Sequence, residues 1–157
     1  MSFTIAAAEE RDIGEIADLF RAYEAHIGVD LSYQGFASEL ATLPGKYAPP
    51  HGQLLIARNA NGAAIGCVAL RPVDAPGCCE MKRLFVSTQG RGFGLGRALT
   101  EAIIAQASKL GYAELRLDTL PTMHEAIALY RKLGFVPIEP YYPAREGTLF
   151  MALSLRA

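Results

Sequence analysis

The stretch QGRGFGLGRAL, Gln89–Leu99, places alternating glycines behind an arginine and directly ahead of a predicted helix. The first turn of a helix exposes about four backbone N–H groups without a partner inside the helix, and the aligned peptide dipoles add partial positive charge there. An anion satisfies both, and glycine allows the backbone to approach it closely with positive φ angles. Arg91 adds a charged donor. The stretch therefore predicts a strand-to-helix turn that binds a phosphate or pyrophosphate.

Two common phosphate-binding motifs do not fit this turn. The dinucleotide fingerprint G-x-G-x-x-G needs a last glycine that the alternating spacing never supplies. The P-loop ends in Gly-Lys-Ser/Thr, whereas this chain has Gly96, Arg97 and Ala98. On spacing alone, a turn whose glycines serve only tight packing therefore stays open as the alternative.

Composition predicts one globular domain over residues 1–157, because 51% of the residues are hydrophobic and 20% are charged. The formal net charge of −1 gives no broad attraction to nucleic acid or to a membrane surface, so neither is an expected partner. We find no signal-peptide pattern and no apolar run near the roughly 20 residues that cross a bilayer. Cys67, Cys78 and Cys79 suit neither a disulfide framework nor a zinc site, so we expect buried thiols, no metal and a reducing cytoplasm.

The hydrophobic spacing predicts an alternation of strands and helices. Strands are expected at Phe3–Ala7, Leu54–Ala57, Ala64–Leu70, Cys78–Val86, Glu114–Asp118 and Thr148–Leu155. Helices are expected from Asp12 to about His26, from Tyr33 to Leu43, from the glycine turn to Gly111, and over Glu125–Leu133. Early meandering strands and a later strand-helix-strand unit imply a mixed sheet with helices on its faces.

Three motifs in order resemble those of the GNAT superfamily of N-acetyltransferases. RGFGLG, Arg91–Gly96, matches the acyl-coenzyme A pyrophosphate loop Q/R-x-x-G-x-G/A. EMKRLFV, Glu80–Val86, is similar to the central strand of that family, and AIALYRKLGF, Ala126–Phe135, is similar to its second signature. The resemblance covers essentially the whole chain. It implies an α/β (α+β) fold with a mixed, largely antiparallel twisted sheet and helices on both faces, and an enzyme that moves an acetyl group from acetyl-coenzyme A to an amine by direct attack.

The resemblance also implies how the cofactor is held. The loop amides would bind its pyrophosphate, and the backbone of the preceding strand would pair with its pantetheine arm. The residues concerned are Arg91, Gly92, Phe93, Gly94, Leu95, Gly96 and Arg97 for the loop, and Leu84, Phe85 and Val86 for the strand. Met123 stands where many family members carry an asparagine that helps hold the cofactor arm. One cofactor contact of the family is therefore in doubt here.

Tyr130 corresponds to the tyrosine that the family places near the thioester sulfur, where a phenol can protonate or hydrogen-bond the leaving thiolate. The alternative is an ordinary core aromatic at helical spacing. Glu80 is the candidate base that yields the neutral amine, acting through water as family members often do. The alternative for Glu80 is a solvated strand residue that forms an ion pair with Lys82 or an arginine. His124 is a second candidate base, although a lone histidine ahead of a helix is more often a surface residue.

The acceptor is expected to be a small-molecule amine, because the chain shows no added recognition module. Tyr141, Tyr142 and Arg145 could line its pocket, with Arg145 holding a carboxylate, or they could belong to an ordinary connecting loop. A protein lysine or N-terminal acetyltransferase is the alternative within the enzyme class. A non-catalytic coenzyme A-binding regulator is the alternative outside it. Dimers are common among the proteins that this chain resembles, so a homodimer is among the expected assemblies.

Overall fold

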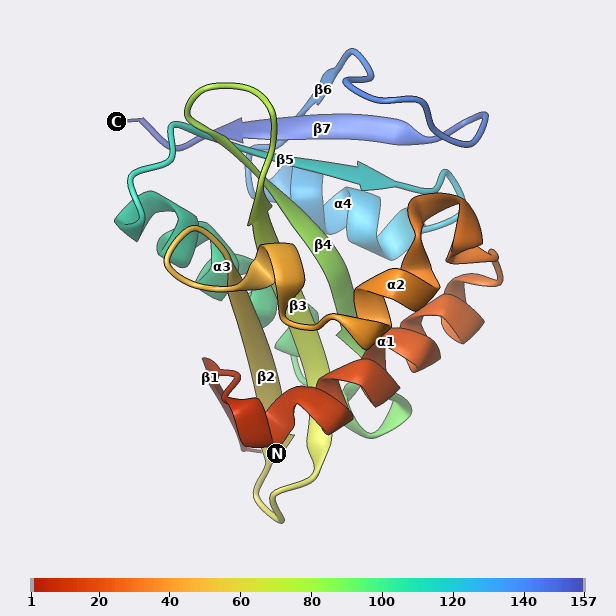
Figure 1. Cartoon of the computed structure of the whole chain (residues 1–157), viewed down its shortest axis with the longest axis vertical. Helices are drawn as coiled ribbons and strands as arrows, with labels where there is room; N and C mark the ends of the chain where they lie inside the picture. Colours follow the sequence, from red (N-terminus) through yellow and green to blue (C-terminus); the bar gives the residue numbers. More distant parts are fainter. Residues whose placement is uncertain (1, 157) are drawn as a thin grey trace.

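The computed structural model describes residues 2–156, and within them seven strands form one twisted sheet in the order β1-β2-β3-β4-β5-β7-β6 (Figure 1). The strands are β1 (Phe3–Ala7), β2 (Gln53–Asn59), β3 (Ala64–Pro72), β4 (Cys78–Val86), β5 (Glu114–Thr119), β6 (Val136–Ile138) and β7 (Leu149–Ser154). Neighbouring strands are antiparallel except β4 and β5, which run parallel. The expectation of a mixed, largely antiparallel sheet is confirmed.

Helices cover both faces of this sheet, as the sequence predicted. Helix α1 (Ile13–Ile27) and the short helix α2 (Phe36–Ala41) pack on one face, while α3 (Leu95–Lys109) and α4 (His124–Lys132) pack on the other (Figure 1). Short 3-10 turns occupy Glu10–Asp12 (η1), Leu31–Gln34 (η2), Gly45–Tyr47 (η3) and Thr88–Gly90 (η4). None of the helices within residues 2–156 is both long and apolar enough to cross a membrane.

Helix α3 shows how apolar spacing fixes the position of the glycine turn. Its buried side chains Leu95, Leu99, Ile103 and Ala107 recur every four residues and face the strands. Residues at this spacing lie on one side of a helix, so their burial anchors the first turn against the sheet. The amino end of α3 is thereby held next to the carboxyl end of β4.

A bulge in β4 controls which side chains reach each face of the sheet. Ala69 of β3 pairs with Lys82 and Cys67 pairs with Phe85, so β4 carries one residue more than β3 between these pairs. Arg83 adopts a left-handed φ of 60°, which is uncommon for a residue other than glycine. Such an extra residue breaks the strict alternation of side chains. Lys82 and Arg83 consequently both contact residues of the face that carries α1 and α2.

The structure differs from the predicted elements at two places. The predicted helix Tyr33–Leu43 is divided into η2 and α2, because Gly35 between them has a left-handed φ of 71°. Strand β6 was not predicted. It has only three residues and contains Pro137, which is tolerated because β6 is an edge strand. The three cysteines are free and buried in β3 and β4, as expected.

Candidate functional site

Strands β4 and β5 separate soon after they meet, and this opens the sheet. They pair only where Cys78–Glu80 faces Glu114–Arg116. Beyond Glu80, no other strand among the described residues pairs with this edge of β4. An open groove and a smaller pocket adjoin there and share Ile27, Leu84 and Met123 in their linings. The opening therefore connects two cavities of different size.

The groove has a volume of about 1120 Å³ and runs along the last residues of β4, the glycine turn and the start of α4. Most of the predicted cofactor-binding residues line it, namely Leu84, Phe85, Val86, Arg91, Gly92, Gly94, Leu95 and Gly96. Phe93, which is 46% exposed, and Arg97, which pairs with Glu101 on α3, are not in the lining. His124 also lines the groove, away from the smaller pocket.

The glycine turn has the geometry that an anion site needs. Gly92 and Gly94 have φ angles of 87° and 74°, and a Cβ added at either would meet no atom within 4 Å. Their backbone therefore borders open space in a conformation that L residues rarely adopt. Arg91 donates from Nε to the carbonyl of Val86 at 3.2 Å, and its Nη2 lies 3.3 Å from Nδ1 of His26. Arg91 thus lines the same groove as the first residues of α3, whose amides are the donors that an anion needs.

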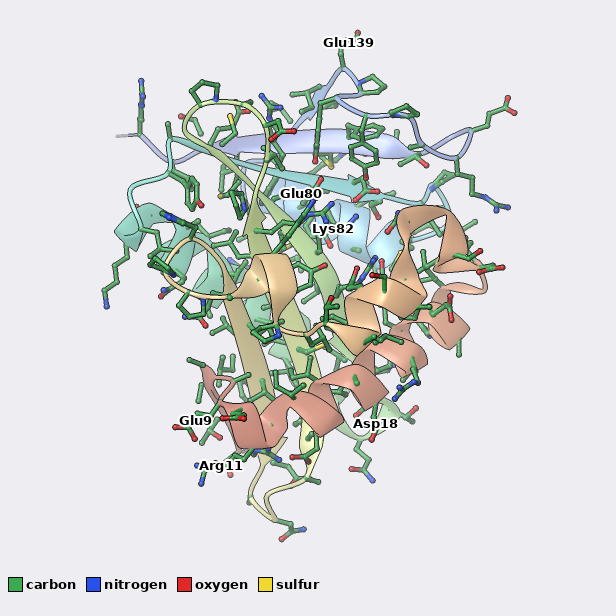
Figure 2. All side chains as sticks on the ribbon, in the orientation of Figure 1. Glu9, Arg11, Asp18, Glu80, Lys82 and Glu139 are labelled. Carbon is green, nitrogen blue, oxygen red and sulfur yellow. The ribbon has the colours of Figure 1, made fainter. Side chains whose placement is uncertain are left out.

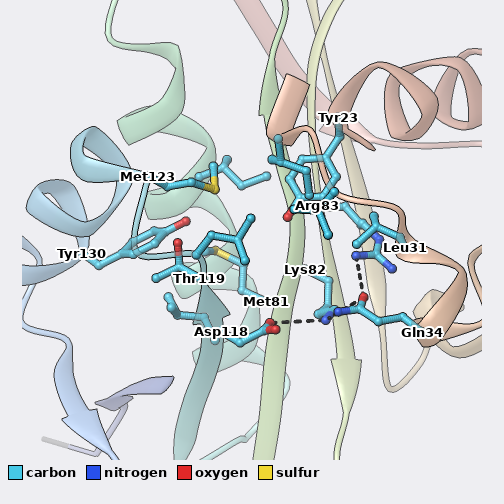
Figure 3. A pocket seen from close by; sticks show the side chains of 15 residues that line it. Tyr23, Leu31, Gln34, Met81, Lys82, Arg83, Asp118, Thr119, Met123 and Tyr130 are labelled. Atoms are coloured by element: carbon cyan, nitrogen blue, oxygen red, sulfur yellow. Dashed lines mark hydrogen bonds and ion pairs between the residues drawn. The ribbon is translucent and has the colours of Figure 1, made fainter. Parts of the chain in front are cut away.

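The smaller pocket, of about 40 Å³, lies between the diverging strands and is covered by α1 and η2. Its polar lining consists of Tyr23, Gln34, Lys82, Arg83, Asp118, Thr119 and Tyr130 (Figure 3). Lys82 Nζ donates to Asp118 Oδ1 at 3.3 Å and to Gln34 Oε1 at 3.5 Å. Burial lowers the pKa of the Lys82 ammonium, and the Asp118 carboxylate opposes that shift.

Tyr130 reaches this pocket from α4 and directs its hydroxyl into it (Figure 3). Its side chain is 5% exposed, and its ring packs against Phe135 with 5.6 Å between the ring centroids. Burial raises the pKa of the Tyr130 phenol above its usual value. The phenol consequently keeps its proton through the neutral range and offers a hydrogen-bond donor inside the pocket.

Glu80 is fully buried in an ion pair rather than in the lining of either cavity. Arg71 donates to its Oε1 from Nη2 at 2.9 Å and from Nε at 3.0 Å, and the Tyr141 hydroxyl donates to its Oε2. Figure 2 shows Glu80 and Lys82 inside the molecule, whereas Glu9 and Glu139 lie at its outside. The arginine pair of the alternative role is therefore present, but the Glu80 carboxylate is buried and not solvated as that alternative expected.

The predicted acceptor residues divide into two partly buried tyrosines of an aromatic cluster and an exposed arginine. Tyr141 and Tyr142 form edge-to-face contacts with each other and with Phe150, at centroid distances of 5.0–5.2 Å. The Tyr142 ring lies 5.8 Å from Lys82 Nζ, and its hydroxyl is buried without a hydrogen-bond partner among the described residues. Arg145 is exposed on the connection that follows and lines neither cavity.

Sequence reasoning did not single out the charged residues of the smaller pocket. Lys82 and Arg83 belong to the quoted central strand, but nothing in the sequence pairs Lys82 with Asp118, 36 residues beyond it, or Arg83 with Glu39, 44 residues before it. The signal that could have found them is two adjacent cations in a strand that is apolar apart from these and Glu80, since buried charges need partners. Over residues 2–156, no group of three or more His, Cys, Asp or Glu side chains could hold a metal ion.

Comparison with known proteins gives consistent matches. A model of the acetyltransferase (GNAT) family matches residues 37–135. An uncharacterized N-acetyltransferase of Schizosaccharomyces pombe is 46% identical over 132 residues, which cover 84% of this chain and 81% of that protein. A GNAT-family acetyltransferase from Staphylococcus aureus shares the fold with a TM-score of 0.82 at 20% identity, over 99% of this chain and 100% of the other. The yncA protein of Salmonella typhimurium, solved with acetyl-CoA, has a TM-score of 0.75 at 22% identity, over 100% and 96% of the two chains.

Proposed function

This chain belongs to the GNAT acetyltransferase family, and we propose that it transfers the acetyl group of acetyl-coenzyme A to the amine of a small molecule. One observation carries the proposal. The groove along the glycine turn and the pocket that contains Tyr130 adjoin at the opening between β4 and β5. A thioester that enters from the groove and an amine that enters from the pocket would meet there.

Acetyl-coenzyme A suits the chemistry of the groove. The amides at the start of α3, together with Gly92, Gly94 and Arg91, would bind the pyrophosphate. The unpaired edge of β4 at Leu84 and Val86 would pair with the amide groups of the pantetheine arm as an added strand does. Bound in this way, the cofactor supplies an activated acetyl group at the opening between the strands.

The chain's own residues would then handle the protons of the reaction. The neutral amine nitrogen forms a bond to the acetyl carbonyl carbon, the carbon–sulfur bond breaks, and the sulfur takes a proton from Tyr130. The proton that the nitrogen loses on forming the amide restores the Tyr130 phenol. Backbone N–H groups of β4 would stabilise the oxyanion of the tetrahedral intermediate. The net change is one amine and one thioester converted into one amide and one thiol.

The proton that the ammonium must lose needs a carboxylate. Glu80 stays the predicted base, and its route to the amine would pass through Tyr141, which donates to it. Asp118 lines the pocket and offers a direct alternative. Replacing each by its amide separates the two roles. If Asp118 is the base, the Asp118→Asn variant loses kcat and the Glu80→Gln variant retains the larger part of it.

A small acceptor is favoured by the size of the pocket. A void of about 40 Å³ accommodates roughly three water-sized groups, and η2 and the Tyr141–Tyr142 cluster lie beside it. The test is release of coenzyme A from acetyl-coenzyme A over a panel of amino acids, polyamines, aminoglycosides and lysine peptides. Release that depends on a small amine supports the proposal. Release of coenzyme A that depends on the peptides alone would make the chain a protein acetyltransferase. If none of the acceptors in the panel causes release, the result would contradict a transferase role.

A further inference from the structure

The Lys82–Asp118 ion pair in the smaller pocket carries an inference about the acceptor. The two side chains are 4% and 13% exposed, so both charges are largely removed from water. Their separation of 3.3 Å is long for a charge-assisted hydrogen bond, which is usually about 2.7–2.9 Å. The next contact of Lys82, with Gln34 at 3.5 Å, is longer still. An ammonium has three donors, so this one keeps donor capacity beside the cavity.

The other charges around the pocket are already compensated by close partners. Arg83 donates to both carboxylate oxygens of Glu39 at 3.0 and 2.8 Å. Glu80 accepts two hydrogen bonds from Arg71, at 2.9 and 3.0 Å. Lys82 and Asp118 therefore form the loosely held pair among these charged groups, and both belong to the lining of the cavity.

The arrangement discriminates between acceptors by their charge. A simple alkylammonium ion that pairs with Asp118 would leave the buried Lys82 ammonium without its counter-charge, and an unpaired buried charge is strongly unfavourable. A molecule that carries an ammonium and a carboxylate on one carbon offers a partner to each member of the pair. It exchanges one long ion pair for two new ones and leaves no charge uncompensated.

We propose that the acceptor is a compact zwitterion of the α-amino acid class, with its carboxylate bound by Lys82 and its ammonium bound by Asp118. The inference rests on the proposed transferase function and names the acceptor class of the same pocket. The cavity of about 40 Å³ limits the bound part to a compact head group, since one water needs roughly 10–15 Å³ of such space. The Tyr130 hydroxyl is directed into the same pocket, which adjoins the groove at Leu84 and Met123, where the leaving sulfur would lie.

The first test measures binding, because binding does not require turnover. The full chain, saturated with coenzyme A, is titrated calorimetrically with the twenty proteinogenic L-amino acids. The tightest binder is then compared with its α-amide and with the amine that lacks the carboxyl group. We expect both derivatives to bind at least about tenfold more weakly, the change that 1.36 kcal/mol produces. Equal or tighter binding of the amide or the amine would overturn the proposal, as would the absence of binding by every amino acid.

Variants of Lys82 separate recognition of the carboxylate from a structural role. In Lys82→Gln the preference for the acid over its amide should fall to about one, while Lys82→Arg, which keeps the cation, should retain a preference. Lys109→Gln makes the same change at an exposed lysine of α3 and should leave the preference as in the wild type. A general loss of folding would weaken the binding of the amino acid and of its α-amide by the same factor. An unchanged preference in folded Lys82→Gln would refute the assignment.

Turnover of the tightest-binding amino acid, compared with that of its α-amide and of the amine without the carboxyl group, separates this inference from the proposed function. Selective binding of amino acids without acetylated product would support the acceptor site and contradict the transferase proposal. Acetylated product formed from amines and amides as readily as from amino acids would support the transferase and contradict the zwitterion site. Product formed chiefly from amino acids, with the preference lost in Lys82→Gln, is the result expected when both hold.

Discussion

Replacing Tyr130 by phenylalanine removes one hydroxyl group from the pocket and leaves the ring in place. The contact with Phe135 at 5.6 Å is kept, so we expect the wall of the pocket and the fold to persist. A hydrogen bond to a charged group contributes about 1.5–3 kcal/mol, and 1.36 kcal/mol changes a rate tenfold. If the phenol donates to the leaving thiolate, kcat should therefore fall about 10- to 150-fold. This range lies at the low end for acid catalysis because a thiolate, whose acid has a pKa of about 8.5, is already a fair leaving group.

The assay follows release of the coenzyme A thiol at saturating acceptor, together with the affinity for acetyl-coenzyme A. The affinity should change little, because the groove proposed to bind the pyrophosphate does not include Tyr130 in its lining. Tyr112→Phe is the matched control. Its hydroxyl donates to the carbonyl of His51 at 2.7 Å and lines neither cavity, so kcat should stay at the wild-type value. A Tyr130→Phe variant that binds the cofactor normally and turns over within twofold of the wild type would refute the acid role.

Three further predictions follow from backbone geometry and titration. Because burial raises the pKa of the Tyr130 phenol above its usual value of about 10, this group stays protonated up to pH 10. The alkaline side of the pH–rate profile of kcat should therefore have the same shape in the wild type and in Tyr130→Phe. Gly94→Ala should lower the free energy of unfolding in urea by about 1–2 kcal/mol, since it places an L residue at a φ of 74° with no steric contact; Gly14→Ala, at ordinary φ on α1 and equally free of contacts, should not lower it. The backbone N–H of Glu9, followed by Arg58, holds the pKa of Asp12 below its usual value, so the carboxylate stabilises the fold above its unfolded pKa. Asp12→Asn should cost about 1 kcal/mol at neutral pH, and this difference should shrink in urea melts as the pH falls below 3.8 and through the lower folded pKa.

The sequence contained enough information for the elements whose signals are local. Helix α3 was predictable because Leu99, Ile103 and Ala107 repeat at helical spacing behind a glycine turn and because Gly111 follows the helix. Strand β6 was not, because three residues that include a proline give no alternation to recognise. Helix α3 was predicted because a local apolar pattern determines which of its residues are buried. Strand β6 was missed because it depends on pairing with the neighbouring strand β7.

The candidate site was predictable only where one segment supplies it. The glycine turn is continuous in sequence, so its position beside the groove follows from the strand before it and the helix after it. The smaller pocket depends on contacts distant in sequence. Lys82 and Asp118 in its lining are 36 residues apart, and Arg83 is 44 residues from its partner Glu39 on α2, so only the tertiary fold brings these residues together. Glu80 illustrates the converse, because a carboxylate placed correctly on the central strand is occupied by Arg71, a partner on the neighbouring strand.

The bulge at Arg83 links both halves of the site. A left-handed backbone conformation costs an L residue roughly 1–2 kcal/mol, and the paired contacts of the guanidinium with Glu39, together with its position over the Phe36 ring at 5.3 Å, offset that cost. A bulge also bends the strand that carries it, and β4 bears this one just beyond its last pair with β5. The bulge brings Lys82 and Arg83 to the pocket, and it therefore lies where β4 presents its free edge to the groove. A substitution that removed the bulge would be expected to disturb acceptor selectivity and coenzyme A binding together, whereas Lys82→Gln should disturb selectivity alone.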